Sequence, residues 1–66
     1  MNWTNVEVGV WFLERHGRYI ARVSILDHQW YAYDNTGGSK SIWSRVGSLE
    51  EGKEYVEATL RLQGRL

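Results

Sequence analysis

The chain has 66 residues, enough for one small domain, and contains no cysteine that could form a disulfide. Eight basic and eight acidic residues cancel to a formal net charge of zero, which argues against a protein that relies on phosphate contacts to bind duplex DNA. Its two histidines, His16 and His28, have no acidic cluster beside them, so we expect neither a metal nor a cofactor. No apolar stretch approaches a membrane span and no signal peptide is recognised, which predicts a cytoplasmic protein.

Alternation of apolar and polar residues predicts antiparallel strands over much of the chain. Glycine and polar residues at His16-Gly17 and Asp27-His28 predict the turns between them. The expected strands cover residues 6–15, 18–26, 29–34 and 40–46, with a loop over 35–39. The last two segments form either two strands or one long bent hairpin, so the predicted sheet has three or four strands.

A C-terminal helix is expected over residues 49–63. Ser48 and Glu51 have the spacing of a capping box, and Gly64 is placed to end the helix. Gly52 lies inside the predicted helix, either because the helix approaches the sheet closely there or because a frayed first turn tolerates a glycine. The chain is therefore predicted to be a single α+β domain, residues 1–66, with an antiparallel sheet packed against one helix.

The face of the sheet away from the helix is the predicted binding surface. Arginine and tryptophan interleave there, a combination found both in protein interface hot spots and in contacts to nucleic acid. Besides a protein interface and a nucleic-acid contact, a third interpretation is a face that is simply solvated, with arginine stems lying over the rings. If the strand periodicity holds, this face carries Trp11, Arg15, Arg18, Ile20, Arg22, Trp43 and Arg45.

The outer side of the helix is predicted to be acidic. Glu50, Glu54 and Glu57 lie there, and Glu57 can pair with Lys53 or with Arg61 at a spacing of four residues. Such a ridge either is simply solvated or occupies a basic groove on a partner.

Catalytic motifs are not recognised. Gly37-Gly38 lacks the spacing of a nucleotide-binding loop, and the Asp27-His28 pair is typical of a solvated turn. A single sheet with one helix also offers little concave surface for a catalytic pocket, so no enzymatic activity is expected.

Three segments resemble a known DNA-binding fold: Gly17-Arg18-Tyr19-Ile20-Ala21-Arg22-Val23, Lys40-Ser41-Ile42-Trp43, and the helix from Ser48-Leu49-Glu50-Glu51-Gly52 to Gly64. The pattern resembles the Apetala-type (ethylene-response-factor) domain and the arm-type DNA-binding domains of phage tyrosine integrases. The resemblance implies a sheet that reads DNA with exposed strand residues, here Arg18, Arg22, Trp43 and Arg45. The segment 26–39 is longer than the usual connection in these domains, and their basic surplus is missing.

In its small size and its zero net charge, the chain also resembles accessory proteins of phages and mobile elements, including anti-CRISPR proteins. The favoured hypothesis is therefore a non-enzymatic module, monomeric or homodimeric, that docks on a nucleic-acid-handling host protein and obstructs it. The alternative is a small DNA-binding protein that uses the exposed sheet face. Neutrality favours the first hypothesis, because non-specific DNA affinity depends on phosphate neutralisation.

Overall fold

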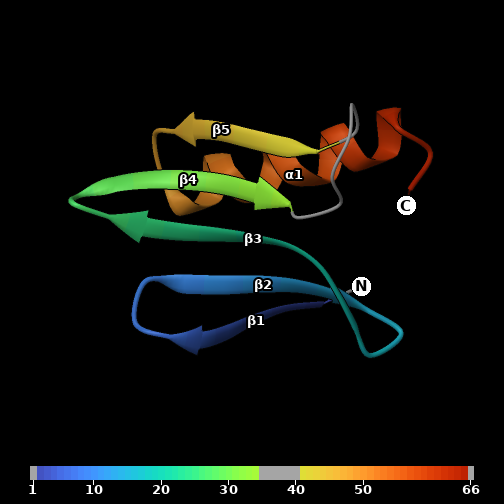
Figure 1. Cartoon of the computed structure of the whole chain (residues 1–66), viewed down its shortest axis with the longest axis horizontal. Coiled ribbons are helices and arrows are strands. Elements are labelled where there is room, and N and C mark those ends of the chain that lie inside the picture. The colour runs from blue at the N-terminus through green and yellow to red at the C-terminus, as the bar shows by residue number, and fades with distance from the viewer. Residues whose placement is uncertain (1, 35–40, 66) are drawn as a thin grey trace.

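A computed structural model describes residues 2–34 and 41–65. Within these ranges the chain forms five strands followed by one helix (Figure 1): β1 (Asn2–Glu7), β2 (Val10–Arg15), β3 (Arg18–Leu26), β4 (Gln29–Asp34), β5 (Ile42–Val46) and α1 (Leu49–Leu62). Each strand pairs antiparallel with the next, in the order β1-β2-β3-β4-β5. The expected α+β fold with an antiparallel sheet and one C-terminal helix is confirmed. The strand count of three or four is wrong by at least one, and the predicted loop over 35–39 lies outside the described residues.

The additional strand arises because residues 6–15 do not form one strand. The chain turns back at Val8-Gly9, where Gly9 has a φ of 75°, and Glu7 pairs with Val10 across the turn. Glycine adopts this left-handed conformation without the steric cost that a side chain incurs. The continuous run of alternating valines from Val6 to Val10 hides this turn in the sequence.

Two tight hairpin turns are found where the sequence predicts them. His16-Gly17 joins Arg15 to its partner Arg18, and Asp27-His28 joins the next strand pair. All four turn residues have positive φ, between 51° and 75°. Two-residue turns of this kind match the right-handed twist of the flanking strands.

Helix α1 has a defined hydrogen-bonded cap at each end. The Ser48 hydroxyl accepts a bond from the Glu51 backbone N–H at 3.2 Å, and the Glu51 carboxylate accepts from the N–H of Gly47 rather than from that of Ser48. At the other end, the N–H of Gly64 donates to the Arg61 carbonyl and that of Arg65 to the Leu60 carbonyl. These paired bonds satisfy carbonyls that a helix end otherwise leaves unpaired.

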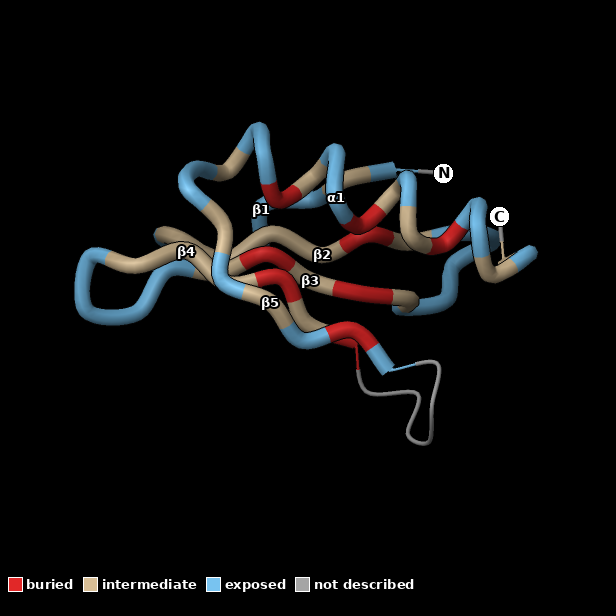
Figure 2. Tube along the Cα trace, turned by 90° about the horizontal axis from the view of Figure 1, so that it is seen from above, coloured by how far each residue is buried: buried red, intermediate tan, exposed pale blue. Residues whose placement is uncertain are grey.

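The core lies between α1 and one face of the sheet (Figure 2), where the helix packs on β3, β4 and β5. Its buried side chains come from all these elements and from β2: Leu13, Ala21, Val23, Ala32, Ile42, Val56 and Leu60. No described segment covers the opposite face of the sheet. No described helix is long and apolar enough to cross a membrane.

Gly52 lies where α1 packs tightly against β3 and β5. A Cβ atom at this position would lie 2.6 Å from Val23 Cγ1 and 3.2 Å from Val46 Cγ2. These separations are shorter than van der Waals contact, so the glycine is required by close packing rather than tolerated near a helix end.

Candidate functional site

The side of strand β2 that faces the helix is not the side that the sequence pattern suggests. Leu13 is fully buried in the core, and the Lys53 ammonium of α1 lies 4.2 Å from the ring centroid of Trp11. Trp11 therefore faces the helix, and its predicted place on the uncovered face is wrong. The pairing of Phe12 with Arg22 decides this, because directly paired residues project from the same face of a sheet.

A β-bulge reverses the expected faces at the start of β3. Leu13 pairs with Ala21 but Glu14 pairs with Tyr19, so Ile20 is an additional residue in the strand. The extra residue shifts the side-chain alternation by one. Ile20 consequently packs against the core, and Tyr19 contacts Phe12 on the uncovered face. The prediction that Ile20 belongs to the uncovered face is wrong.

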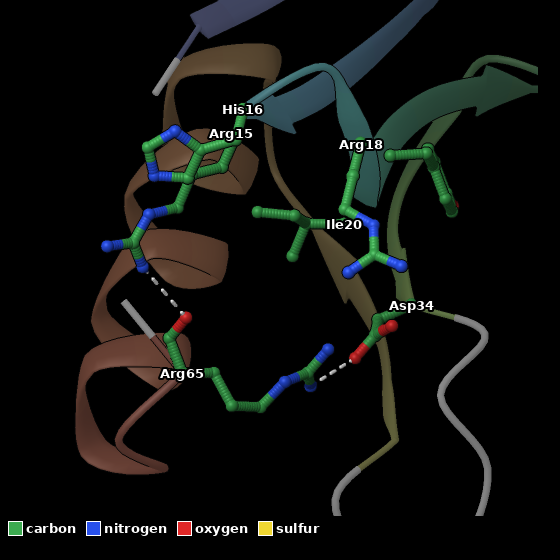
Figure 3. A pocket seen from close by; sticks show the side chains of 7 residues that line it. Arg15, His16, Arg18, Ile20, Asp34 and Arg65 are labelled. Atoms are coloured by element: carbon green, nitrogen blue, oxygen red, sulfur yellow. Dashed lines mark hydrogen bonds and ion pairs between the residues drawn. The ribbon is translucent and has the colours of Figure 1, made fainter.

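Arg15 and Arg18 also leave the predicted surface. They border a hollow at the end of the molecule, beside the C-terminal end of α1 (Figure 3). Both remain exposed, but they do not join the row of residues along the open face of the sheet.

Arg22, Trp43 and Arg45 do project from the uncovered face, as predicted. Arg22 pairs with Tyr33, Trp43 also pairs with Tyr33, and Arg45 pairs with Tyr31. Arg45 additionally borders a second hollow between β5 and α1. Together these side chains form what we call the aromatic face: Phe12, Tyr19, Arg22, Tyr31, Tyr33, Trp43 and Arg45.

The rings of the aromatic face are organised around Arg22. The rings of Phe12 and Tyr19 meet edge to face at 4.9 Å, and those of Tyr31 and Trp43 do so at 5.0 Å. Between these pairs, the Arg22 guanidinium lies 4.8 Å from the centroid of the Tyr33 ring, within the range of a cation–π contact. Each contact restricts the side chains before any ligand arrives.

Much apolar and cationic surface stays available on this face. Trp43 is 65% exposed and Tyr19 is 41% exposed. Arg22 and Arg45 form no ion pair within residues 2–34 and 41–65. The Arg22 Nε is buried without a hydrogen-bond acceptor. An exposed surface with this composition is typical of a contact site.

The alternation of residues along the strands does not reveal four of the five aromatic residues on this face, namely Phe12, Tyr19, Tyr31 and Tyr33. Small core residues could have indicated two of them. Ala32 lies between Tyr31 and Tyr33, and only a small side chain fits beneath a closely packed helix. The two tyrosines must then point the other way. No comparable sequence signal marks the bulge that places Tyr19.

The hollow at the end of the molecule is strongly basic. It lies between the β2–β3 turn, the end of β4 and the C-terminal end of α1 (Figure 3), and we call it the basic hollow. Its lining consists of Arg15, His16, Arg18, Tyr19, Ile20, Asp34 and Arg65.

Three polar contacts hold the wall of the basic hollow together. Arg65 forms an ion pair with the buried Asp34 and donates a 3.0 Å hydrogen bond to Gln63 Oε1. Arg15 Nη1 donates a longer bond, at 3.4 Å, to the Arg65 carbonyl. The carboxylate of Asp34 is thus already occupied, and the lining contributes three guanidinium groups against one carboxylate.

The predicted acidic side of the helix is divided between two environments. Glu50 and Glu54 are exposed. Glu57 instead accepts a 2.8 Å hydrogen bond from the Trp3 indole of β1, and it pairs with Arg61 at 3.6 Å. Lys53 contacts Trp11 rather than pairing with Glu57, so the acidic ridge is smaller than expected.

No family model, curated protein or solved structure matches this chain. Among the described residues, no three His, Cys, Asp or Glu side chains gather where they could hold a metal ion.

Proposed function

We propose that this chain is a non-enzymatic binding module that docks on a protein through its aromatic face. The observation that carries the proposal is a row of five rings and two arginines on a sheet face that no described segment covers. Tryptophan, tyrosine and arginine are the residues most often responsible for binding energy at protein interfaces. The edge-to-face ring pairs also reduce the side-chain entropy that binding would otherwise cost.

A protein fits this face better than duplex DNA does. Of the three arginines that the Apetala-type resemblance implies would face DNA, only Arg22 and Arg45 lie on the face, while Arg18 lies at the basic hollow. Two guanidinium groups neutralise few phosphates, and the molecule has no net positive charge to compensate. Ring-rich surfaces also have few groups that can read base edges in the major groove.

A different protein fits better than a second copy of this chain. Arg22 lies on the central strand of the sheet, and neither of its paired neighbours, Phe12 and Tyr33, is acidic. A symmetric face-to-face dimer whose two-fold axis passes through the centre of the sheet would bring the two Arg22 side chains together, which is electrostatically unfavourable. The partner is therefore expected to supply apolar groups for the rings and carboxylates for the guanidinium groups. The resemblance to phage-encoded inhibitors favours a nucleic-acid-handling host protein, which the bound module would obstruct.

The first experiment identifies the partner by photo-cross-linking. A photoreactive phenylalanine analogue is placed at Tyr31 on the aromatic face, and as a control at Leu62 on the helix, which is 89% exposed. We expect the Tyr31 position to cross-link to one defined protein and the Leu62 position to give no such product.

The second experiment measures affinity for that purified partner. Trp43→Ala should weaken binding at least tenfold, or about 1.4 kcal/mol, because it removes an exposed hot-spot ring. Glu54→Ala on the outer side of the helix is the matched control and should leave the affinity unchanged. Equal affinities of the two variants would refute the proposal. Salt-sensitive binding to random duplex DNA that Trp43→Ala abolishes would support the DNA-binding alternative instead.

A further inference from the structure

The basic hollow and the aromatic face form one continuous surface, because Tyr19 belongs to both. Its ring contacts Phe12 on the sheet face, and the same residue lines the hollow together with Arg18 and Ile20. A ligand lying along the aromatic face at this end would therefore reach the hollow without crossing a gap.

The hollow combines an apolar centre with a cationic rim. In Figure 3 the Ile20 side chain lies between Arg15, Arg18 and the Arg65 side chain. Arg65 is held by Asp34, while no ion pair engages Arg15 or Arg18 within the described residues. The rim therefore has two guanidinium groups that are available to pair with anionic groups, one on each side of an apolar patch.

This arrangement fits carboxylates on an apolar segment better than a phosphate-rich ligand. Arginine pairs with carboxylates through parallel hydrogen bonds, and the apolar side chains between them would cover Ile20. A dense polyanion would gain little from the apolar centre, and a molecule of zero net charge does not steer polyanions from a distance.

We infer that the basic hollow receives an acidic, apolar segment of the protein partner, whose carboxylates pair with Arg15 and Arg18. This inference rests on the proposed function and adds to it the chemistry of the partner at one end of the interface. The contact would fix which way round the partner lies along the strands. The opposite end of the sheet lacks an equivalent arginine pair among the described residues.

The first test uses a defined probe and needs no knowledge of the partner. A five-residue peptide of alternating aspartate and leucine is titrated into the full chain and followed by amide chemical shifts. We expect the amides of residues 15–20 and 65 to move with a dissociation constant of about 1 mM, a range reached by a few contacts. The double variant Arg15→Gln, Arg18→Gln should abolish these shifts, and a peptide of alternating lysine and leucine should cause none.

Two outcomes of this titration would overturn the inference. One is the absence of shifts at these residues. The other is a response to inorganic phosphate without a response to the acidic peptide, which would make the hollow a site for small anions.

The second test separates this inference from the proposed function, using the purified partner. The Arg15→Gln, Arg18→Gln variant should bind at least tenfold more weakly and show a reduced dependence on salt. If it binds normally while Trp43→Ala is impaired, the aromatic face is the docking surface and the role of the hollow is refuted. If neither is impaired, the proposed function fails as well.

Discussion

Tyr19 is the residue at which the bulge, the aromatic face and the basic hollow meet. Burial raises the pKa of its hydroxyl above the ordinary value of 10.0, and the nearby Asp34 and Tyr33 act in the same direction, against the opposing effect of Arg22. An acid whose pKa is raised by folding holds its proton more tightly in the native state than in the unfolded state.

The stability of the fold should therefore depend on Tyr19 in alkaline solution. Its contribution is fully present below about pH 10 and is lost as the pH rises through the higher pKa of the native state. We expect the free energy of unfolding, measured in urea at about pH 8 and about pH 11, to fall more for the wild type than for Tyr19→Phe. An equal fall in both proteins would show that other groups account for the alkaline loss.

Small residues on both sides set the spacing between α1 and the sheet. Gly52 on the helix meets Val23 directly, and Ala21 and Ala32 are fully buried on the facing strands. The helix can approach the sheet closely there because these side chains are short.

Gly52→Ala tests this close contact. Alanine in place of glycine normally stabilises a helix by about 1 kcal/mol. Here the added methyl group would lie 2.6 Å from Val23 Cγ1, and overpacking typically costs about 1–3 kcal/mol. We expect a net loss of roughly 1 kcal/mol by urea denaturation, whereas the exposed Glu54→Ala should stay within about 0.5 kcal/mol of wild type. A more stable Gly52→Ala protein would contradict the packing argument.

Sequence patterns predict the elements of this fold better than they predict which face each side chain takes. The helix, its Ser48 cap, its stop at Gly64 and two of the hairpin turns were predictable, because each depends on residues adjacent in the chain. The faces of β2 and the start of β3 were not, because side-chain direction depends on strand pairing. One extra residue, Ile20, is enough to exchange the sides of Tyr19 and Ile20.

An ion pair joins the segment after α1 to the end of the sheet's fourth strand. Arg65 follows the last helical turn, and Asp34 ends β4, 31 residues earlier in the chain. Asp34 is only 3% exposed, so its charge has little access to water. Such a pair holds the wall of the basic hollow in place.

Removing one partner of this pair should be costly. Arg65→Met is expected to lower the free energy of unfolding by about 3 kcal/mol, because it leaves a buried carboxylate without its principal cation. The double variant Asp34→Asn, Arg65→Met should recover part of that loss in a double-mutant cycle measured by urea denaturation. Additive effects of the two substitutions would indicate that the residues do not interact energetically.

Local patterns predicted the fold class, the C-terminal helix and an arginine- and aromatic-rich surface, because alternation, capping and turn chemistry depend on neighbouring residues. Which rings share the uncovered face, and which arginines gather at the hollow, followed from strand pairing in three dimensions. Turns and bulges set strand register, and register assigns every side chain of a strand to one face or the other. A shift of one residue therefore moves a side chain between the core and the uncovered face.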